Sequence, residues 1–130
     1  YQQQLVIRRM AEDLSLPIAI LTAPTVREDD GLAMSSRNAY LDESEREVAP
    51  VLYATLRSVA VQLEAGARDF AKLEQTARDA LARAGFEPDY VAIRGADDLG
   101  PPAAVSGKLV VLAAAQLGAA RLIDNLVVAV

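Results

Sequence analysis

The stretch KLVVLAAAQLGAARLIDNLVVAV, residues 108–130, contains two runs that are rich in valine, leucine and alanine. The first run extends from Lys108 to Ala115, the second extends from Ala120 to Val130, and Gly118 lies between them. Apolar runs of this length on either side of a glycine are typical of two buried β-strands joined by a turn. This part of the chain therefore predicts a sheet, and the residues before it indicate what covers that sheet.

Two helices are predicted before these strands. For the first, Asp42 and Glu45 resemble a capping box in which Asp replaces the usual Ser or Thr, and Gly66 supplies a stop. Pro50 lies inside the helical pattern, so we expect this helix to begin later than the cap or to kink at the proline. The face that we expect to be buried contains Val48, Val51, Leu52, Leu56, Val59 and Leu63.

The second helix is predicted to run from Asp69 to about Ala84, with Gly85 ending it. A further strand is predicted at residues 90–94, where the sequence Tyr-Val-Ala-Ile-Arg alternates in the manner of a strand. Two helices and about three strands, grouped in separate runs, indicate an α+β layout. The inward residues of the second helix are expected to be Phe70, Leu73, Ala77 and Leu81.

The beginning of the chain has a different pattern. Residues 2–14 mix apolar and charged residues at helical spacing, and Pro17 follows them. Ile18 to Leu21 is a short apolar run, which is consistent with a buried strand. A helix followed by a strand is half of an α/β unit, and the chain opens on Tyr1 without an initiator Met. We therefore expect a piece of a longer protein.

The composition narrows the possible chemistry. The 130 residues include 13 basic and 18 acidic side chains, a net charge of −5, and neither histidine nor cysteine. An acidic chain is a poor candidate for binding nucleic acid, and a chain without His or Cys has no disulfide, thiol nucleophile or histidine base of its own. Because we find no signal peptide and no apolar stretch of about 20 residues, we expect a cytoplasmic protein with no membrane partner.

The most informative polar segment is DGLAMSSRN, residues 30–38. It places two hydroxyls and a guanidinium near a glycine, where the backbone can turn. Loop hydroxyls, backbone N–H groups and an arginine suit phosphate oxygens, because a guanidinium can donate two hydrogen bonds to them at once. A solvated loop in which serine caps a following turn accounts for the same residues, so the spacing alone leaves both interpretations open.

Three motifs resemble the pantoate–β-alanine ligase (pantothenate synthetase) family, and together they span nearly the whole chain. The longest is PTVR, residues 24–27, followed by DGLAMSSRN, in which MSSR (residues 34–37) is similar to the KMSKS loop of class I nucleotidyl-transferring enzymes. The opening YQQ, residues 1–3, resembles the end of the family's G-x-K-D-[YF]-x-Q segment. LGAARLIDN, residues 117–125, matches the family's closing L-G-x-x-R-L-I-D-N region.

The resemblance implies a ligase that condenses D-pantoate with β-alanine, using ATP and Mg²⁺. Pantoyl-adenylate forms first with release of pyrophosphate, and β-alanine then displaces AMP to give pantothenate. The resemblance makes residues 1–24 the last helix and strand of a Rossmann-like α/β nucleotide-binding domain. Residues 25–38 would be the ATP loop and hinge. Residues 39–130 would be a C-terminal α+β lid domain of helices and a small antiparallel sheet.

The family's H-x-G-H motif is absent from this chain. The resemblance therefore places that motif, the Mg²⁺ ligands and the homodimer interface in an N-terminal domain outside these residues. The chain alone is expected to be inactive, and its small-molecule partners in the whole protein would be pantoate, β-alanine and ATP.

The resemblance also assigns roles to individual residues. The residues expected to bind ATP are Thr25, Val26, Met34, Ser35, Ser36 and Arg37. The last three of these are also expected to be catalytic, because they would hold the phosphates as charge develops during adenylate formation. Gln3 is expected to hydrogen-bond pantoate.

Other charged residues receive plainer interpretations. The acidic run at residues 28–30 is expected to face solvent and not to bind a metal. Arg121 and Asp124 are expected to be structural and to hold the final strand in place. One alternative function stays open on the sequence alone: a non-catalytic α+β interaction module that keeps the fold without the chemistry.

Overall fold

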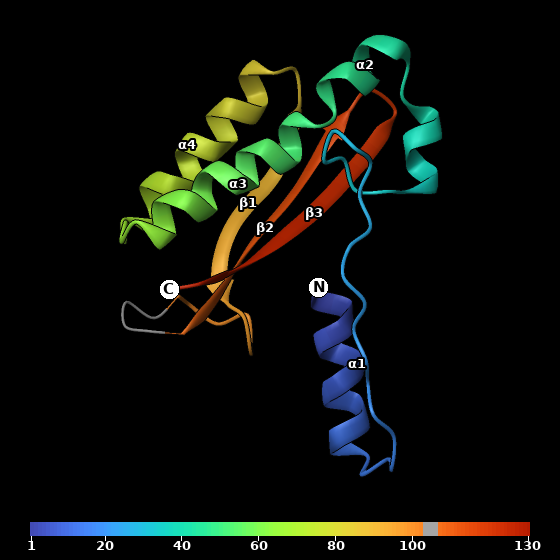
Figure 1. Ribbon diagram of the computed structural model, residues 1–130, viewed down its shortest axis with the longest axis vertical. Helices are drawn as coiled ribbons and strands as arrows, with labels where there is room; N and C mark the ends of the chain where they lie inside the picture. Colours follow the sequence, from blue (N-terminus) through green and yellow to red (C-terminus); the bar gives the residue numbers. More distant parts are fainter. Residues whose placement is uncertain (103–106) are drawn as a thin grey trace.

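The computed structural model describes residues 1–102 and 107–130. Its helices are α1 (Gln2–Asp13), the 3-10 helix η1 (Ser36–Tyr40), α2 (Glu43–Val48), α3 (Val51–Glu64) and α4 (Phe70–Arg83). Its strands are β1 (Glu87–Gly95), β2 (Lys108–Leu117) and β3 (Ala120–Ala129). The strands form one antiparallel sheet in the order β1-β2-β3. Helices α3 and α4 cover one face of this sheet (Figure 1), which confirms the α+β prediction.

Strand β2 is the centre of the sheet because it pairs with a neighbour on each side. Its residues are buried on both faces almost throughout, which explains why the sequence shows an uninterrupted apolar run there. A two-residue turn joins it to β3, since Leu117 pairs with Ala120. The pairing with β1 shifts its register between Pro88 and Tyr90, beside a proline that has no N–H for the ladder.

The core lies between the sheet and the two long helices. The helices contribute residues at the predicted spacing, and the sheet contributes the facing residues of β1 and β2. The largest fully buried side chains of the molecule are Leu52, Leu56, Leu63, Leu81, Ile93, Val91, Val110, Val111 and Val128. We refer to α2, α3, α4 and the sheet together as the C-terminal body.

Pro50 separates two helices instead of interrupting one. Helix α2 ends at Val48, and Pro50 occupies the N-cap position of α3, where its missing N–H costs no hydrogen bond. The predicted capping box is confirmed at the start of α2. The carboxylate of Asp42 accepts the backbone N–H of Glu45 at 2.8 Å, and the side chain of Glu45 accepts the backbone N–H of Asp42 at 2.9 Å.

This capping box makes stability depend on acid pH. The N–H of Glu45 and the hydroxyl of Ser44 hold the pKa of Asp42 below its ordinary value of 3.8. A carboxyl whose pKa is lower in the folded state stabilises that state above its ordinary pKa, and this contribution disappears as the pH falls through the lower, folded value.

We therefore expect Asp42→Asn, which keeps a capping side chain but cannot ionise, to lower Tm at about pH 7. The difference from the original chain should close as the pH falls below 3.8. Thermal melts followed by circular dichroism measure this, with Glu64→Gln on α3 as the control. A Tm difference that does not vary with pH would contradict the assignment.

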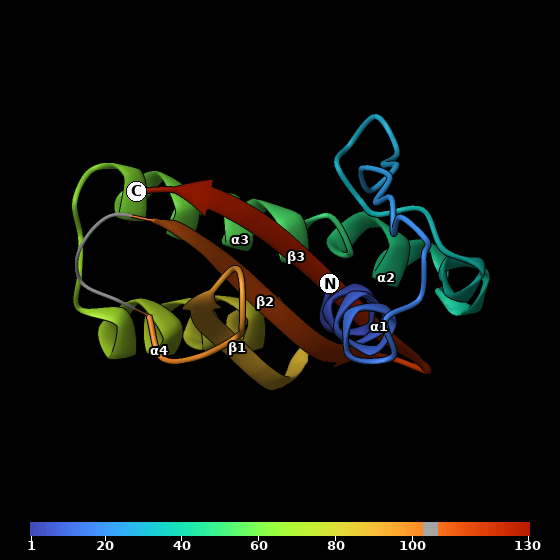
Figure 2. The same cartoon turned by 90° about the horizontal axis from the view of Figure 1, so that it is seen from below.

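Residues 1–25, which we call the N-terminal arm, project from the C-terminal body (Figures 1 and 2). The Tyr1 hydroxyl anchors the arm by donating to the carbonyl of Ala96 at 2.7 Å. The prediction of a buried strand at Ile18–Leu21 is wrong for this structure: residues 16–25 form neither helix nor strand, and Leu21 is 90% exposed. A strand needs a hydrogen-bonding neighbour, and β1, β2 and β3 all lie in the C-terminal body.

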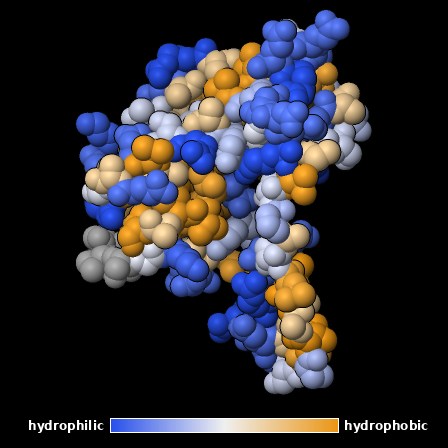
Figure 3. Space-filling model, in the orientation of Figure 1, coloured by the Kyte–Doolittle hydropathy of each residue, from blue (hydrophilic) through white to orange (hydrophobic). Residues whose placement is uncertain are grey.

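The arm also carries exposed apolar side chains, which Figure 3 shows along its lower part. Its exposed large apolar residues are Val6, Ile7, Met10, Leu14, Leu16, Ile18 and Leu21. Within residues 1–102 and 107–130, no helix is long and apolar enough to cross a membrane.

Candidate nucleotide-loop site

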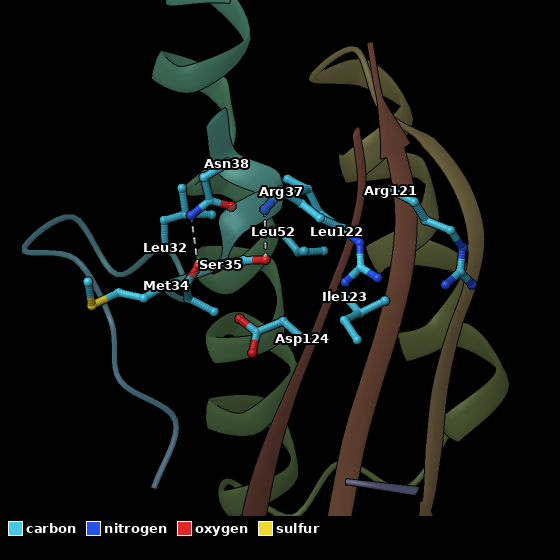
Figure 4. A pocket seen from close by; sticks show the side chains of 11 residues that line it. Leu32, Met34, Ser35, Arg37, Asn38, Leu52, Arg121, Leu122, Ile123 and Asp124 are labelled. Atoms are coloured by element: carbon cyan, nitrogen blue, oxygen red, sulfur yellow. Dashed lines mark hydrogen bonds between the residues drawn. The ribbon is translucent and has the colours of Figure 1, made fainter. Parts of the chain in front are cut away.

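A pocket of about 200 Å³ lies between the segment at residues 32–38 and strand β3 (Figure 4). We call it the loop pocket. It is lined by Leu32, Ala33, Met34, Ser35, Arg37, Asn38, Leu52, Arg121, Leu122, Ile123 and Asp124. The pocket thus joins two of the sequence motifs, DGLAMSSRN and LGAARLIDN, which are far apart in the chain.

Residues Met34–Arg37, the MSSR loop, are shaped by local hydrogen bonds. Ser35 is the N-cap of η1, and its hydroxyl accepts the backbone N–H of Arg37 at 3.2 Å. The side-chain amide of Asn38 donates to the carbonyl of Ala33 at 3.0 Å, which fixes the far side of the same turn. Ser35 therefore caps a turn, as one of the two interpretations predicts. This role is compatible with phosphate binding, because the capped turn leaves the side chain of Arg37 in the lining of the loop pocket.

The segment before the MSSR loop is a short hairpin from Val26 to Met34. The N–H of Met34 donates to the carbonyl of Val26 at 2.9 Å, and the N–H of Glu28 donates to the carbonyl of Leu32 at 2.8 Å. Gly31 turns the chain with a φ of +94°, a conformation that favours glycine. The acidic run lies in this hairpin, and its Asp30 carboxylate accepts the guanidinium of Arg46 at 2.6 Å.

Arg27 and Asp124 form the most buried ion pair of the site. Two guanidinium nitrogens of Arg27 donate to the two carboxylate oxygens of Asp124, at 2.7 and 3.0 Å. The hydrogen bond to Asp124 raises the pKa of Arg27 above its ordinary value. Asp124 therefore makes the kind of structural contact that the sequence predicts, as does Arg121, whose guanidinium donates to Asp89 at 2.6 Å.

These ion pairs determine which charged side chains of the loop pocket are free to bind a ligand. Asp124 and Arg121 are each paired, whereas the guanidinium of Arg37 donates no hydrogen bond within the described part of the chain. Arg37 reaches toward Ile123, and Met34 extends the other way, 57% exposed (Figure 4). The hydroxyl of Ser35 and the free guanidinium of Arg37 suit an anion such as a phosphate.

The remaining predicted site residues are spread over the surface. Thr25 lines a second pocket of about 500 Å³ between the arm and β3, which we call the arm pocket, with Tyr1 and Gln4. Val26 is 66% exposed at the base of the hairpin. Ser36 and Gln3 are exposed and belong to neither lining. The structure thus gathers Met34, Ser35 and Arg37 in one pocket and leaves the other four outside it.

Two residues of the site were missed by sequence reasoning. Arg27 organises the hairpin, and Asn38 has a buried Oδ1 with no hydrogen-bond partner in the described part of the chain. Arg27 belongs to the PTVR motif and Asn38 to the DGLAMSSRN motif, but their partners, Asp124 and the carbonyl of Ala33, are revealed only by the fold.

Comparisons with known proteins identify relatives that match almost the whole chain. The family model described as Pantoate-beta-alanine ligase matches residues 1–127. A pantothenate synthetase of Ectopseudomonas mendocina is 54% identical over 128 residues, covering 98% of this chain and 45% of that relative. One of Halorhodospira halophila is 56% identical over 126 residues, covering 96% of this chain and 44% of that relative. The chain therefore spans less than half the length of these curated relatives.

Solved structures show the same likeness. The pantothenate synthetase of Thermus thermophilus superposes with a TM-score of 0.88 at 41% identity, covering 97% of this chain and 46% of that one. A pantoate-beta-alanine ligase of Francisella tularensis, complexed with beta-gamma ATP and beta-alanine, superposes with a TM-score of 0.67 at 25% identity, covering 97% and 40%. By fold, by the MSSR and LIDN motifs and by these matches, the chain belongs to the pantoate-beta-alanine ligase family.

Proposed function

We propose that this chain is the C-terminal part of an enzyme that condenses D-pantoate with β-alanine, using ATP, by way of a pantoyl-adenylate. The single observation that carries this proposal is the loop pocket, where the hydroxyl of Ser35 and the unpaired guanidinium of Arg37 lie together. The Francisella relative, whose complex contains beta-gamma ATP and beta-alanine, supports the choice of ATP as the anion.

The proposed mechanism is mainly electrostatic. The carboxylate of pantoate attacks the α-phosphorus of ATP, and pyrophosphate leaves as the bond to the α-phosphorus breaks. The amine of β-alanine then attacks the acyl carbon of the adenylate, AMP leaves, and the amine loses a proton. Ser35, Ser36 and Arg37 would donate to phosphate oxygens on which negative charge grows, and donors held in position before the reaction would lower its barrier.

The other predicted residues would position the substrates. Met34 would pack near the adenosine, the backbone at Thr25 and Val26 would meet the adenine edge, and Gln3 would hydrogen-bond pantoate. Thr25 in the arm pocket suggests that the nucleotide extends from the loop pocket toward the arm. A site divided in this way needs residues from outside this chain to be complete.

Mg²⁺ would be held by those residues from outside the chain. Asp124 lines the loop pocket and Asp30 lies in the hairpin before the MSSR loop, and each already accepts hydrogen bonds from an arginine: Asp124 from Arg27 and Asp30 from Arg46. Mg²⁺ requires oxygen ligands that are free to coordinate it, and these two are engaged. When bound, the ion would neutralise charge on the phosphates of ATP.

The domain assignment follows from the same proposal. Residues 1–24 would belong to the nucleotide-binding domain, residues 25–38 would carry the ATP loop, and residues 39–130 would form the domain that closes over the site. The exposed apolar residues of the arm would pack against the remainder of the nucleotide-binding domain, since several exposed apolar residues gathered on one segment are typical of an interface. The homodimer would form through that domain.

The test is AMP release by the complete ligase that contains this chain. We expect AMP to form only when pantoate and β-alanine are both present, because the adenylate needs the first and its breakdown needs the second. AMP formation that ignores pantoate would leave a nucleotide site with a different substrate. No AMP at all from a folded enzyme would favour the interaction module instead.

A binding measurement on residues 1–130 alone is the companion control. Calorimetric titration with ATP should detect weak binding or none, because only part of the site is present. Tight binding by this chain alone would contradict the divided site while leaving the family unaffected.

A further inference from the structure

We propose that Arg27 is a positioning residue, which fixes the Val26–Met34 hairpin to strand β3 so that the MSSR loop belongs mechanically to the C-terminal body. This inference rests on the proposed function, since it concerns the placement of the phosphate-binding loop. It also relocates the flexible part of the connection. Motion between the two parts of the enzyme would then occur before the hairpin, between Thr22 and Val26.

The contacts of Arg27 carry the first step of the argument. Its guanidinium donates to both carboxylate oxygens of Asp124, to the carbonyl of Gly31 at 3.1 Å and to the carbonyl of Asn125 at 3.4 Å. It also lies over the ring of Tyr53, with 3.7 Å between its carbon and the ring centroid. A single side chain therefore joins the hairpin to β3 and to α3.

Burial makes these contacts strong. The side chain of Asp124 is 3% exposed and that of Arg27 is 17% exposed. Water competes poorly for a bidentate pair in such a place, and removing one partner leaves the other charge buried without compensation. The geometry also needs the planar fork of arginine, because a lysine ammonium could not reach the carboxylate and both carbonyls together.

The hairpin transmits this anchoring to the MSSR loop. Arg27 pairs with Ala33 in an antiparallel bridge, so fixing one side of the hairpin fixes the other. Ala33 directly precedes the MSSR loop and also accepts the amide of Asn38. A second, more exposed tie between Asp30 and Arg46 holds the tip of the hairpin to α2.

The segment before Val26 is different. Residues 16–25 form neither helix nor strand, and none of them belongs to the hydrophobic core clusters. Arg8 of α1 donates to the hydroxyl of Thr22 at 3.2 Å, which ties this segment to α1, and Thr22 to Thr25 also line the arm pocket opposite β3. Along this segment the side-chain hydrogen bonds change from α1, at Thr22, to β3, at Arg27. A rotation of the arm at this point would also have to release the Tyr1 hydroxyl from the carbonyl of Ala96.

The test is Arg27→Lys in the complete ligase, with Arg94→Lys as the matched control. Arg94 pairs with Glu74 at 3.2 Å on the sheet, away from the MSSR loop. We expect Arg27→Lys to lower pantoate-dependent exchange of labelled pyrophosphate into ATP by up to about 10²-fold, the cost of misplacing a reacting group by about 1 Å. The KM for β-alanine should not change. Arg94→Lys should leave both unchanged.

A second readout separates positioning from simple loss of stability. On residues 1–130, we expect the amides of Glu28 and Met34 to exchange with deuterium faster in Arg27→Lys than in Arg94→Lys, at a temperature where both variants are folded. Asp124→Asn should have the same effects. The double variant Arg27→Lys/Asp124→Asn should be no worse than the more impaired single variant, because both act on one contact.

Equal exchange of the Glu28 and Met34 amides in the two lysine variants would overturn the inference, even if the proposed function stands. So would a loss of activity that follows Tm alone and appears in Arg94→Lys to the same degree. If the original enzyme shows no pantoate-dependent exchange, the proposed function fails, and the amide measurement on residues 1–130 still decides whether Arg27 fixes the hairpin.

Discussion

Replacing Arg37 with alanine in the complete ligase should lower kcat for AMP formation by about 10²–10³-fold, by analogy with the removal of one preplaced donor to a developing oxyanion. The structure explains why this side chain is suited to the task. Arg37 lies on η1, and its side chain lines the loop pocket. Within the described residues its guanidinium makes no hydrogen bond that would have to break before it could bind a phosphate. The fold itself should be unaffected, because Arg37 is exposed.

Two controls sharpen this expectation. Arg83→Ala removes an exposed arginine from the last turn of α4 and should leave kcat unchanged. Arg37→Lys keeps the charge but not the fork, so its activity should lie between those of the original enzyme and Arg37→Ala. Steady-state assays of AMP release measure all three. A normal kcat in Arg37→Ala would mean that the arginine is only a surface charge.

Gly31→Ala should destabilise the molecule and displace the MSSR loop. Gly31 has a φ of +94°, and a Cβ there would lie 2.7 Å from a ring carbon of Tyr53. The backbone conformation alone costs an alanine about 1–2 kcal/mol. The clash adds to this cost, because either the hairpin or the Tyr53 ring, over which Arg27 lies, must shift. We therefore expect a lower Tm together with a lower rate of adenylate formation.

Gly85 provides the matched control. Its φ of +99° is similar, but a Cβ there would meet nothing within 4 Å. Gly85→Ala should show the backbone cost alone and keep normal activity, so the difference between the two variants isolates the contact with Tyr53. Denaturant unfolding measures the two stabilities. Equal losses in both variants would show that the ring moves aside freely, and the displacement of the loop would then be ruled out.

Local periodicity predicted the two long helices and the strands of the C-terminal body, but not the separation of α2 from α3. The alternating strand at Tyr90–Arg94, the helical face of α3 and the cap at Asp42 each follow from residues within a few positions of one another. The MSSR loop was found through its resemblance to a family and not through its spacing. Its position beside β3 then showed which of its residues share a pocket.

The failures have one physical cause in common, which is dependence on distant partners. Ile18–Leu21 has the composition of a strand, yet it has no neighbouring strand to pair with and is exposed. Arg27 belongs to the PTVR motif, but its structural role depends on Asp124, which lies 97 positions further along the chain. Neither propensity nor periodicity carries information over such a separation.

That separation has a consequence for the order of assembly. The helices and strands of the C-terminal body follow one another along the sheet, α3 and α4 before β1, β2 and β3, so most of its contacts are between neighbours in sequence and favour rapid folding. The hairpin that precedes the MSSR loop is synthesised early, but Arg27 cannot fix it in place until β3, which contains Asp124, has been synthesised and has folded. At about 5–20 residues per second, a ribosome needs roughly 5–20 s to add the 97 residues from Arg27 to Asp124. The MSSR loop is thus among the first parts of this chain to be synthesised and among the last to be fixed in place.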